Sequence, residues 1–131
     1  MRSRHISCVI AAPPAEVYAF AADPDHLPAW AAGLAEGEVR REGDRLLVDS
    51  PMGRVEVTFA PRNPFGVLDH DVRLPSGEVV TNPVRVLPHP DGAEVVFTLR
   101  SLGLTDAEFE RDAATVERDL AALRRLVEHG R

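Results

Sequence analysis

Two polar residues, His70 and Asn82, combine a side-chain type and a position that could serve chemistry. His70 lies in segment 66–74, where residues alternate along the predicted strand. His70 falls on the same face as the apolar residues, and the acids fall on the opposite face. In segment 78–87, Asn82 falls on the same face of the predicted strand as the valines that alternate with the other residues. Because the charged side of each predicted strand faces water, both side chains are expected to point into the protein interior.

The length of the turn between these two segments determines whether His70 and Asn82 lie opposite each other. If turn 75–77 closes Leu74 onto Glu78, His70 lies directly opposite Asn82. A slightly longer turn makes them diagonal neighbours, which are still within reach of one another. In an apolar pocket, an imidazole and a carboxamide can orient a ligand carbonyl or hydroxyl. The amide can also fix the tautomer of the ring for proton transfer.

Three interpretations of this pair stay open. The two side chains are polar anchors for a ligand, or His70 is a general acid or base, or they form a satisfied structural pair in the core. The structural interpretation has weight because an unpaired buried polar group costs about 1–3 kcal/mol, so partners are expected with or without a function.

Apolar and aromatic residues complete the candidate site. Trp30 follows a proline-capped turn, where it either roofs a cavity or pins a short helix to the core. Tyr18 is expected near the same mouth, and Met52 is either a gate residue or a plain loop methionine. Four further residues are core by default and form the cavity wall if the core is hollow. They are Phe59, Phe97, Phe109 and Val116.

The elements that position these residues follow from hydrophobic periodicity. Segment 5–11 predicts a first strand, and Pro13-Pro14 and Asp23-Pro24 each predict the start of a short helix. Alternation with a period of two then continues to residue 100, interrupted by turn residues, and predicts consecutive antiparallel hairpins. The six strands expected there are 38–41, 45–50, 54–60, 66–74, 78–87 and 93–100.

The C-terminal segment predicts one long amphipathic helix. Thr105 and Glu108 form a capping box, and an apolar stripe follows at spacings of four and three. About 25 helical residues make a rod of about 37 Å, long enough to cross a sheet. We therefore expect an α+β fold in which a seven-stranded, curved antiparallel sheet wraps around this helix.

Composition limits the possible functions. At 131 residues, with 44% hydrophobic and 27% charged residues, the chain fits one globular domain, 1–131. The net charge of −6 and scattered basic residues argue against nucleic-acid binding and against attraction to anionic membranes. Neither a membrane span nor a signal peptide is expected, so the chain is expected to be cytoplasmic. Cys8 is the only cysteine, which excludes an intramolecular disulfide.

No metal or cofactor is expected from the sequence. In Asp69-His70-Asp71 the acids and the imidazole would point to opposite faces of one strand, and the remaining histidines lack ligand spacing. The sequence shows no glycine-rich phosphate loop, nucleophile elbow or HExxH motif.

Several stretches resemble a known superfamily. Segments 12–20 and 23–30, APPAEVYAF and DPDHLPAW, are similar to the opening signature of the polyketide cyclase/START-like (SRPBCC) superfamily. Segments 65–71, 82–86 and 94–99 resemble a bacterial branch of it. The resemblance covers essentially the whole chain. It implies a helix-grip fold with a hydrophobic cavity beneath the terminal helix, in a superfamily of lipid carriers, hormone receptors, cyclases and ATPase activators.

The function expected from these observations is binding of a small hydrophobic or amphipathic molecule, such as a lipid, polyketide or aromatic metabolite. The alternative is a cyclase or dehydratase that uses His70 as general acid or base, which would need a further polar partner near His70. A third possibility is a module that modulates another protein, which would need an exposed apolar patch.

Overall fold

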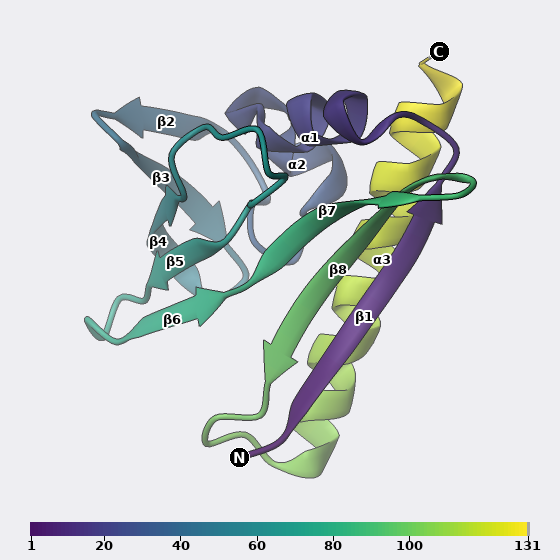
Figure 1. Ribbon diagram of the computed structural model, residues 1–131. Coiled ribbons are helices and arrows are strands. Elements are labelled where there is room, and N and C mark those ends of the chain that lie inside the picture. Colours follow the sequence, from purple (N-terminus) through teal and green to yellow (C-terminus); the bar gives the residue numbers. More distant parts are fainter. Residues whose placement is uncertain (131) are drawn as a thin grey trace.

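Eight strands, three short helical segments and one long helix make up residues 1–130, which the computed structural model describes. Figure 1 shows their arrangement. In chain order the elements are β1 (Ser3–Ile10), α1 (Pro14–Ala22), the 3₁₀ segment η1 (Pro24–His26), α2 (Leu27–Trp30), β2 (Val39–Glu42), β3 (Arg45–Ser50), β4 (Gly53–Phe59), β5 (His70–Arg73), β6 (Val79–Asn82), β7 (Val84–His89), β8 (Gly92–Arg100) and α3 (Asp106–His129).

The strands form two antiparallel sheets. One has the order β1-β8-β7 and the other the order β2-β3-β4-β5-β6. The α+β class, the antiparallel pairing and the terminal helix are confirmed, but the expectation of a single seven-stranded sheet is wrong. The eighth strand arises because the predicted strand 78–87 is divided between the two sheets.

Pro83 is the physical reason for this division. It has no backbone N–H, so it cannot continue a ladder of hydrogen bonds. Before it, β6 pairs with β5, and after it, β7 pairs with β8. The predicted strand 66–74 is shortened in the same way, because only His70–Arg73 pairs with β6. The preceding residues 66–68 lie instead along β7.

Gly66 allows residues 66–68 to lie against β7. Its carbonyl accepts a hydrogen bond from Val86 N at 2.9 Å, and its φ is 74°. A Cβ atom added here would come within 2.2 Å of the Val86 carbonyl oxygen. Glycine is therefore required at this position for both conformation and space.

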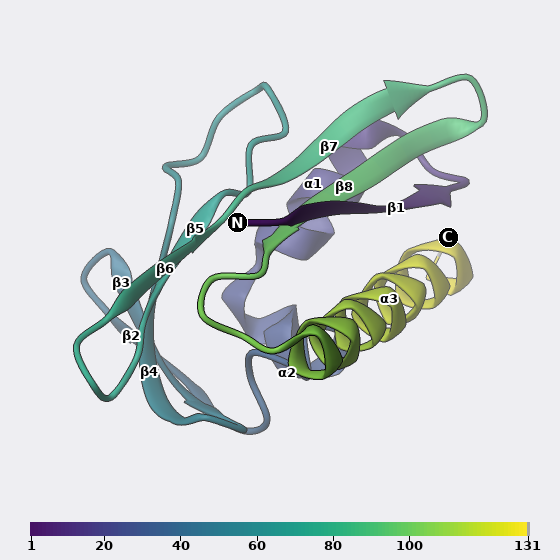
Figure 2. The ribbon, with the colours of Figure 1, turned by 90° about the horizontal axis from the view of Figure 1, so that it is seen from below.

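Helix α3 confirms the predicted amphipathic helix. Thr105 and Glu108 form the capping box in both directions. The stripe on α3 is buried and consists of Phe109, Ala113, Val116, Leu120, Leu123 and Val127. The helix packs chiefly against β1 and to a smaller extent against β8, α1 and α2. Figures 1 and 2 show it running alongside β1, with β2 to β6 on the other side of the molecule.

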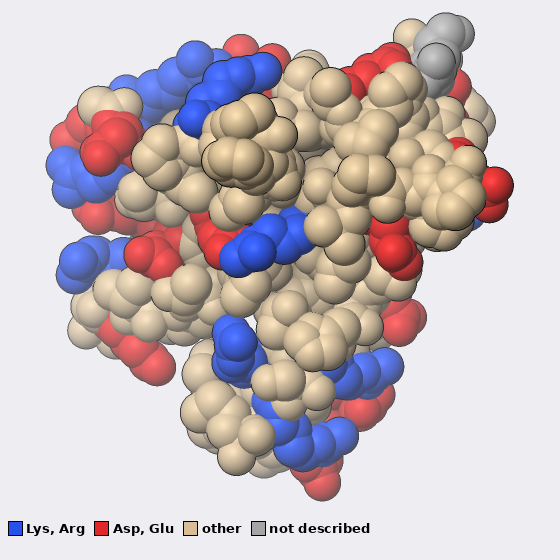
Figure 3. All heavy atoms as spheres, viewed as in Figure 1, with Lys and Arg blue, Asp and Glu red and all other residues tan. Residues whose placement is uncertain are grey.

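The surface carries both charge signs. On the face seen in Figure 3, basic and acidic side chains are interspersed, with a group of basic ones at the upper left, over β2. Within residues 1–130, no helix combines the length and the apolar character that crossing a membrane requires.

Candidate functional site

His70 and Asn82 lie opposite each other on neighbouring strands, in the register expected from the short turn. They are paired positions of β5 and β6, and Leu74 N donates to Glu78 O at 2.8 Å to close the hairpin. His70 is buried at 7% exposure, and Asn82 is partly buried. Their side chains contact through Asn82 Nδ2 and His70 Nε2, which are 3.5 Å apart, at the long limit of a hydrogen bond.

The contacts of His70 define its protonation. Its Nδ1 lies 3.1 Å from the Leu68 carbonyl oxygen, which can only accept, so Nδ1 carries the proton in this contact. Burial lowers the pKa of His70 below its ordinary value, and this outweighs the hydrogen bond to Leu68 and the charges of Asp69 and Asp71, which raise it. The imidazole is therefore neutral near pH 7, and Nε2 is a hydrogen-bond acceptor that faces the Asn82 amide.

Two phenylalanines flank the imidazole. Phe59 is its partner across β4 and β5, and the ring centroids are 4.8 Å apart. Phe97 on β8 meets the imidazole edge-on at 6.2 Å. Both rings are only partly buried although they lie on the inward face. The structure therefore brings four of the predicted site residues together: His70, Asn82, Phe59 and Phe97.

The other predicted wall residues belong to the same core but have different neighbours. Phe109 on α3 is fully buried beneath the Arg2 guanidinium, 5.1 Å from the ring centroid. Val116 lies on the buried stripe of α3 at 8% exposure. Trp30 is 7% exposed, and its indole Nε1 is buried without a hydrogen-bond partner among the described residues. An unsatisfied buried donor costs stability, and the described residues provide no acceptor for this N–H.

Tyr18 and Met52 have structural surroundings. The Tyr18 hydroxyl accepts a hydrogen bond from Asn63 N at 3.1 Å, and the Arg62 guanidinium lies 5.4 Å from the centre of the Tyr18 ring. Tyr18 thus holds the loop after β4 against α1. Met52 is 52% exposed in the turn between β3 and β4, as a plain loop methionine would be.

Sequence reasoning missed the group that holds the strands beside His70. Asp69 Oδ1 accepts hydrogen bonds from Val84 N and from Arg85 Nε, both at 2.9 Å. Its other oxygen, Oδ2, lies 2.8 Å from Arg85 Nη2. The hydrogen bond from Arg85 is the main cause that lowers the pKa of Asp69. The available signal was Pro83, since a proline inside a predicted inner strand indicates an interruption that another group must satisfy.

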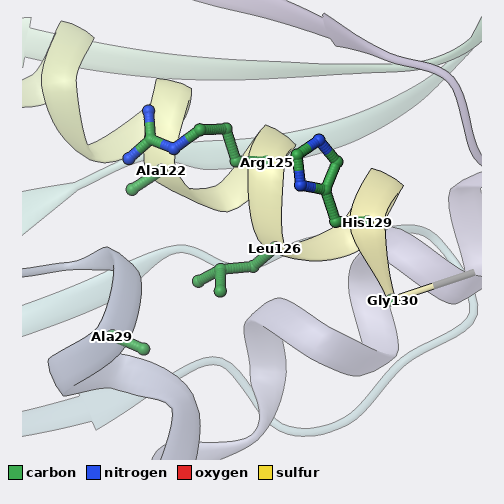
Figure 4. A pocket seen from close by; sticks show the side chains of 6 residues that line it. All are labelled: Ala29, Ala122, Arg125, Leu126, His129 and Gly130. Carbon is green, nitrogen blue, oxygen red and sulfur yellow. The ribbon is translucent and has the colours of Figure 1, made fainter.

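Two surface pockets lie away from His70 and Asn82. One of about 470 Å³ is lined by α2 and the end of α3. Figure 4 shows Leu126 directed from α3 toward Ala29 of α2. A second, of about 410 Å³, is lined by residues of the outer face of β3 to β6, on the opposite side of the sheet from His70. Within residues 1–130, no group of three or more His, Cys, Asp or Glu side chains is placed to hold a metal ion.

Solved structures with the same fold span nearly the whole chain. The Aha1 dimer from Colwellia psychrerythraea is 15% identical, with a TM-score of 0.78 and coverage of 100% of this chain and 99% of that one. A protein from Chromobacterium violaceum is 20% identical, with a TM-score of 0.70 and coverage of 98% and 99%. DynU16, from the dynemicin biosynthetic locus, is 16% identical, with a TM-score of 0.75 and coverage of 98% of this chain and 48% of that one.

The family assignment comes from the sequence. No curated protein sequence matches this chain. The model of a family described as "Polyketide cyclase / dehydrase and lipid transport" matches residues 1–128. The chain therefore belongs to this polyketide cyclase/dehydrase and lipid transport family, of SRPBCC type.

Proposed function

We propose that this protein binds a small hydrophobic or amphipathic molecule between its sheets and α3. The observation that carries the proposal is the buried imidazole of His70 between two inward phenyl rings that remain partly exposed. In a core packed only for stability, inward aromatic rings are covered by other side chains. A few polar groups in an otherwise apolar recess are typical of a ligand site.

Two polar groups support an amphipathic ligand. The Asn82 amide and His70 Nε2 form a donor and an acceptor side by side. The family description includes lipid transport. Lipids, polyketides and aromatic metabolites combine an apolar body with oxygen-bearing polar groups. The proposed ligand class is the one that matches this mixture.

A cyclase or dehydratase is the second candidate function, and the observation that favours it is the contact of His70 Nδ1 with the Leu68 carbonyl, which leaves the lone pair on Nε2. A general base needs a lone pair near the operating pH, which Nε2 has. Among the described residues, however, Asn82 is the only polar side chain in contact with Nε2. Binding therefore needs fewer further assumptions than catalysis. A reaction rate that follows the titration of His70 would favour the enzyme.

Native mass spectrometry of the protein purified from its own host tests the proposal directly. The expected result is a mass increase from a bound small molecule that organic solvent releases. If no molecule is retained, 2-naphthol serves as a probe, titrated by its own fluorescence. Absence of both a retained molecule and saturable probe binding would contradict the proposed function.

The variant His70→Leu separates binding from structure. It replaces the imidazole by an apolar side chain of similar size and so removes the Nε2 acceptor. The affinity for 2-naphthol should therefore fall about tenfold, as expected for one lost hydrogen bond. The free energy of unfolding should change by less than the affinity does. Asp71→Ala, on the outer face of the same strand, is the matched control and should bind normally. Unchanged affinity together with a large stability loss would support the structural interpretation of His70.

A further inference from the structure

The ladder between Leu68 and Val84 lacks one of its two expected hydrogen bonds. The two residues face each other in the register that pairs His70 with Asn82. Leu68 N donates to Val84 O at 2.8 Å, as in a regular antiparallel pair. The reverse bond, from Val84 N to Leu68 O, would complete the exchange of a hydrogen-bonded pair. Val84 N instead donates to Asp69 Oδ1 at 2.9 Å.

The carbonyl oxygen of Leu68 has a different partner. It accepts the bond from His70 Nδ1 at 3.1 Å. One missing backbone hydrogen bond is therefore replaced by two side-chain bonds. Asp69 accepts in place of the Leu68 carbonyl, and His70 donates in place of the Val84 N–H. If the carboxylate of Asp69 were absent, the Leu68 carbonyl would be the acceptor that the Val84 N–H meets across the ladder. That oxygen has two lone pairs and would then accept from both donors, and sharing it would weaken the bond that holds the proton on Nδ1.

We propose that Asp69 is a positioning residue that fixes the tautomer of His70. By accepting the Val84 N–H, it leaves the Leu68 carbonyl oxygen to hold the proton on Nδ1. The Nε2 lone pair then faces Asn82 inside the proposed site. Asp69 itself lies on the outer face of the strand and acts through the backbone.

Arg85 holds the carboxylate in place for this role. Its guanidinium contacts both oxygens of Asp69, at 2.9 and 2.8 Å, and such bidentate geometry orients a carboxylate as well as neutralising it. These contacts hold Oδ1 toward the Val84 N–H. Asp71, two residues along the same face, bonds instead to Thr81 Oγ1 and has no part in this arrangement.

The tautomer narrows the class of ligand, an inference that rests on the proposed function. Nε2 has one lone pair, which Asn82 Nδ2 meets only at 3.5 Å, so a ligand oxygen placed between the two nitrogens would replace this long contact. A hydroxyl group can donate to the first and accept from the second, whereas a ketone or ether oxygen can only accept. The site is thus complementary to a phenol or alcohol on an apolar body.

The tautomer is measured by ¹⁵N NMR of the imidazole of His70. In the wild-type protein, Nδ1 should show the shift of a protonated nitrogen and Nε2 that of an unprotonated one. In Asp69→Ala, the ratio of the two tautomers should fall, by at most about tenfold, which is the effect of one fully lost hydrogen bond. Asp69→Asn, which keeps an oxygen acceptor for Val84 N, and Asp71→Ala should both retain the wild-type signature.

An unchanged tautomer in Asp69→Ala would overturn the role of Asp69. If that variant does not fold, the wild-type protein decides the question. Scalar coupling through the hydrogen bond should connect the Val84 amide to the side-chain carboxyl carbon of Asp69. Coupling of that amide to the backbone carbonyl carbon of Leu68 would contradict the proposal.

Three matched probes test the ligand class: 2-naphthol, 2-methoxynaphthalene and 2-methylnaphthalene. The wild-type protein should bind 2-naphthol about tenfold more tightly than the ether, and Asp69→Ala should lose that preference. Equal binding of the three probes would refute the hydroxyl preference while leaving the binding function in place. If none of the three binds and native mass spectrometry finds no retained molecule, the proposed function itself fails, and the NMR result still decides the role of Asp69.

Discussion

The inward faces of the two sheets carry similar alternating patterns but are covered differently. The three-stranded sheet lies against α3, and its inward residues include Ile10, Ala93 and Val95, which are at most 1% exposed. At the β5–β6 end of the five-stranded sheet, the inward residues include His70 and the partly buried Asn82. Polar groups and residual exposure occur together at this end of the five-stranded sheet.

This difference separates stability from function. Where α3 covers the sheet, close packing of apolar side chains provides stability, and every methylene contributes. Where coverage is incomplete, buried polar groups cost stability unless they are paired, so their presence suggests another use. The following variants test whether the two regions differ as this interpretation requires.

The largest expected effect comes from removing one phenyl ring in each region. Phe109→Ala, in the helix-covered region, should lower the free energy of unfolding by about 4 kcal/mol, because a fully buried ring leaves a cavity. Phe59→Ala, beside His70, should cost less than half as much, because its ring is only partly buried. Urea denaturation of both variants measures the difference. Equal losses would mean that the two regions are packed alike.

A smaller effect is expected where α3 meets the segment after α2. The carboxylate of Asp119 accepts a hydrogen bond from Gly33 N at 3.3 Å. Burial raises the pKa of Asp119 from 3.8 to about 6, against the opposing effects of the Gly33 hydrogen bond and Arg118. Since the folded state holds this proton more tightly, the group favours folding most below pH 3.8, and that contribution is lost as the pH rises through about 6.

Asp119→Asn keeps the acceptor for Gly33 N but removes the charge. At pH 7 the variant should be more stable than the wild type by about 1 kcal/mol, after allowance for the part of the carboxyl that water still screens. Urea unfolding at pH 4, 5, 6 and 7 should show this advantage shrinking toward the acidic end. An advantage that does not change with pH would contradict a charge effect at this position.

The periodicity of the sequence determined most of the fold. The capping box, the buried stripe of α3 and the register of His70 against Asn82 all follow from local rules, because side-chain direction repeats every 3.6 residues in a helix and every two in a strand. The family also follows from the sequence. Inward placement of the imidazole and the carboxamide required only parity and the length of one turn.

Tertiary structure alone decided how the strands are shared between sheets and what holds the imidazole. Pro83 marks an interruption, but which neighbour takes each strand depends on pairing over long sequence separations, such as that of Thr98 N with Pro83 O. The bonds of Asp69 to Val84 and Arg85 span 15 and 16 residues, beyond the reach of any local pattern. Parity indicates which way a side chain points, whereas its hydrogen-bond partners are set only when distant segments meet.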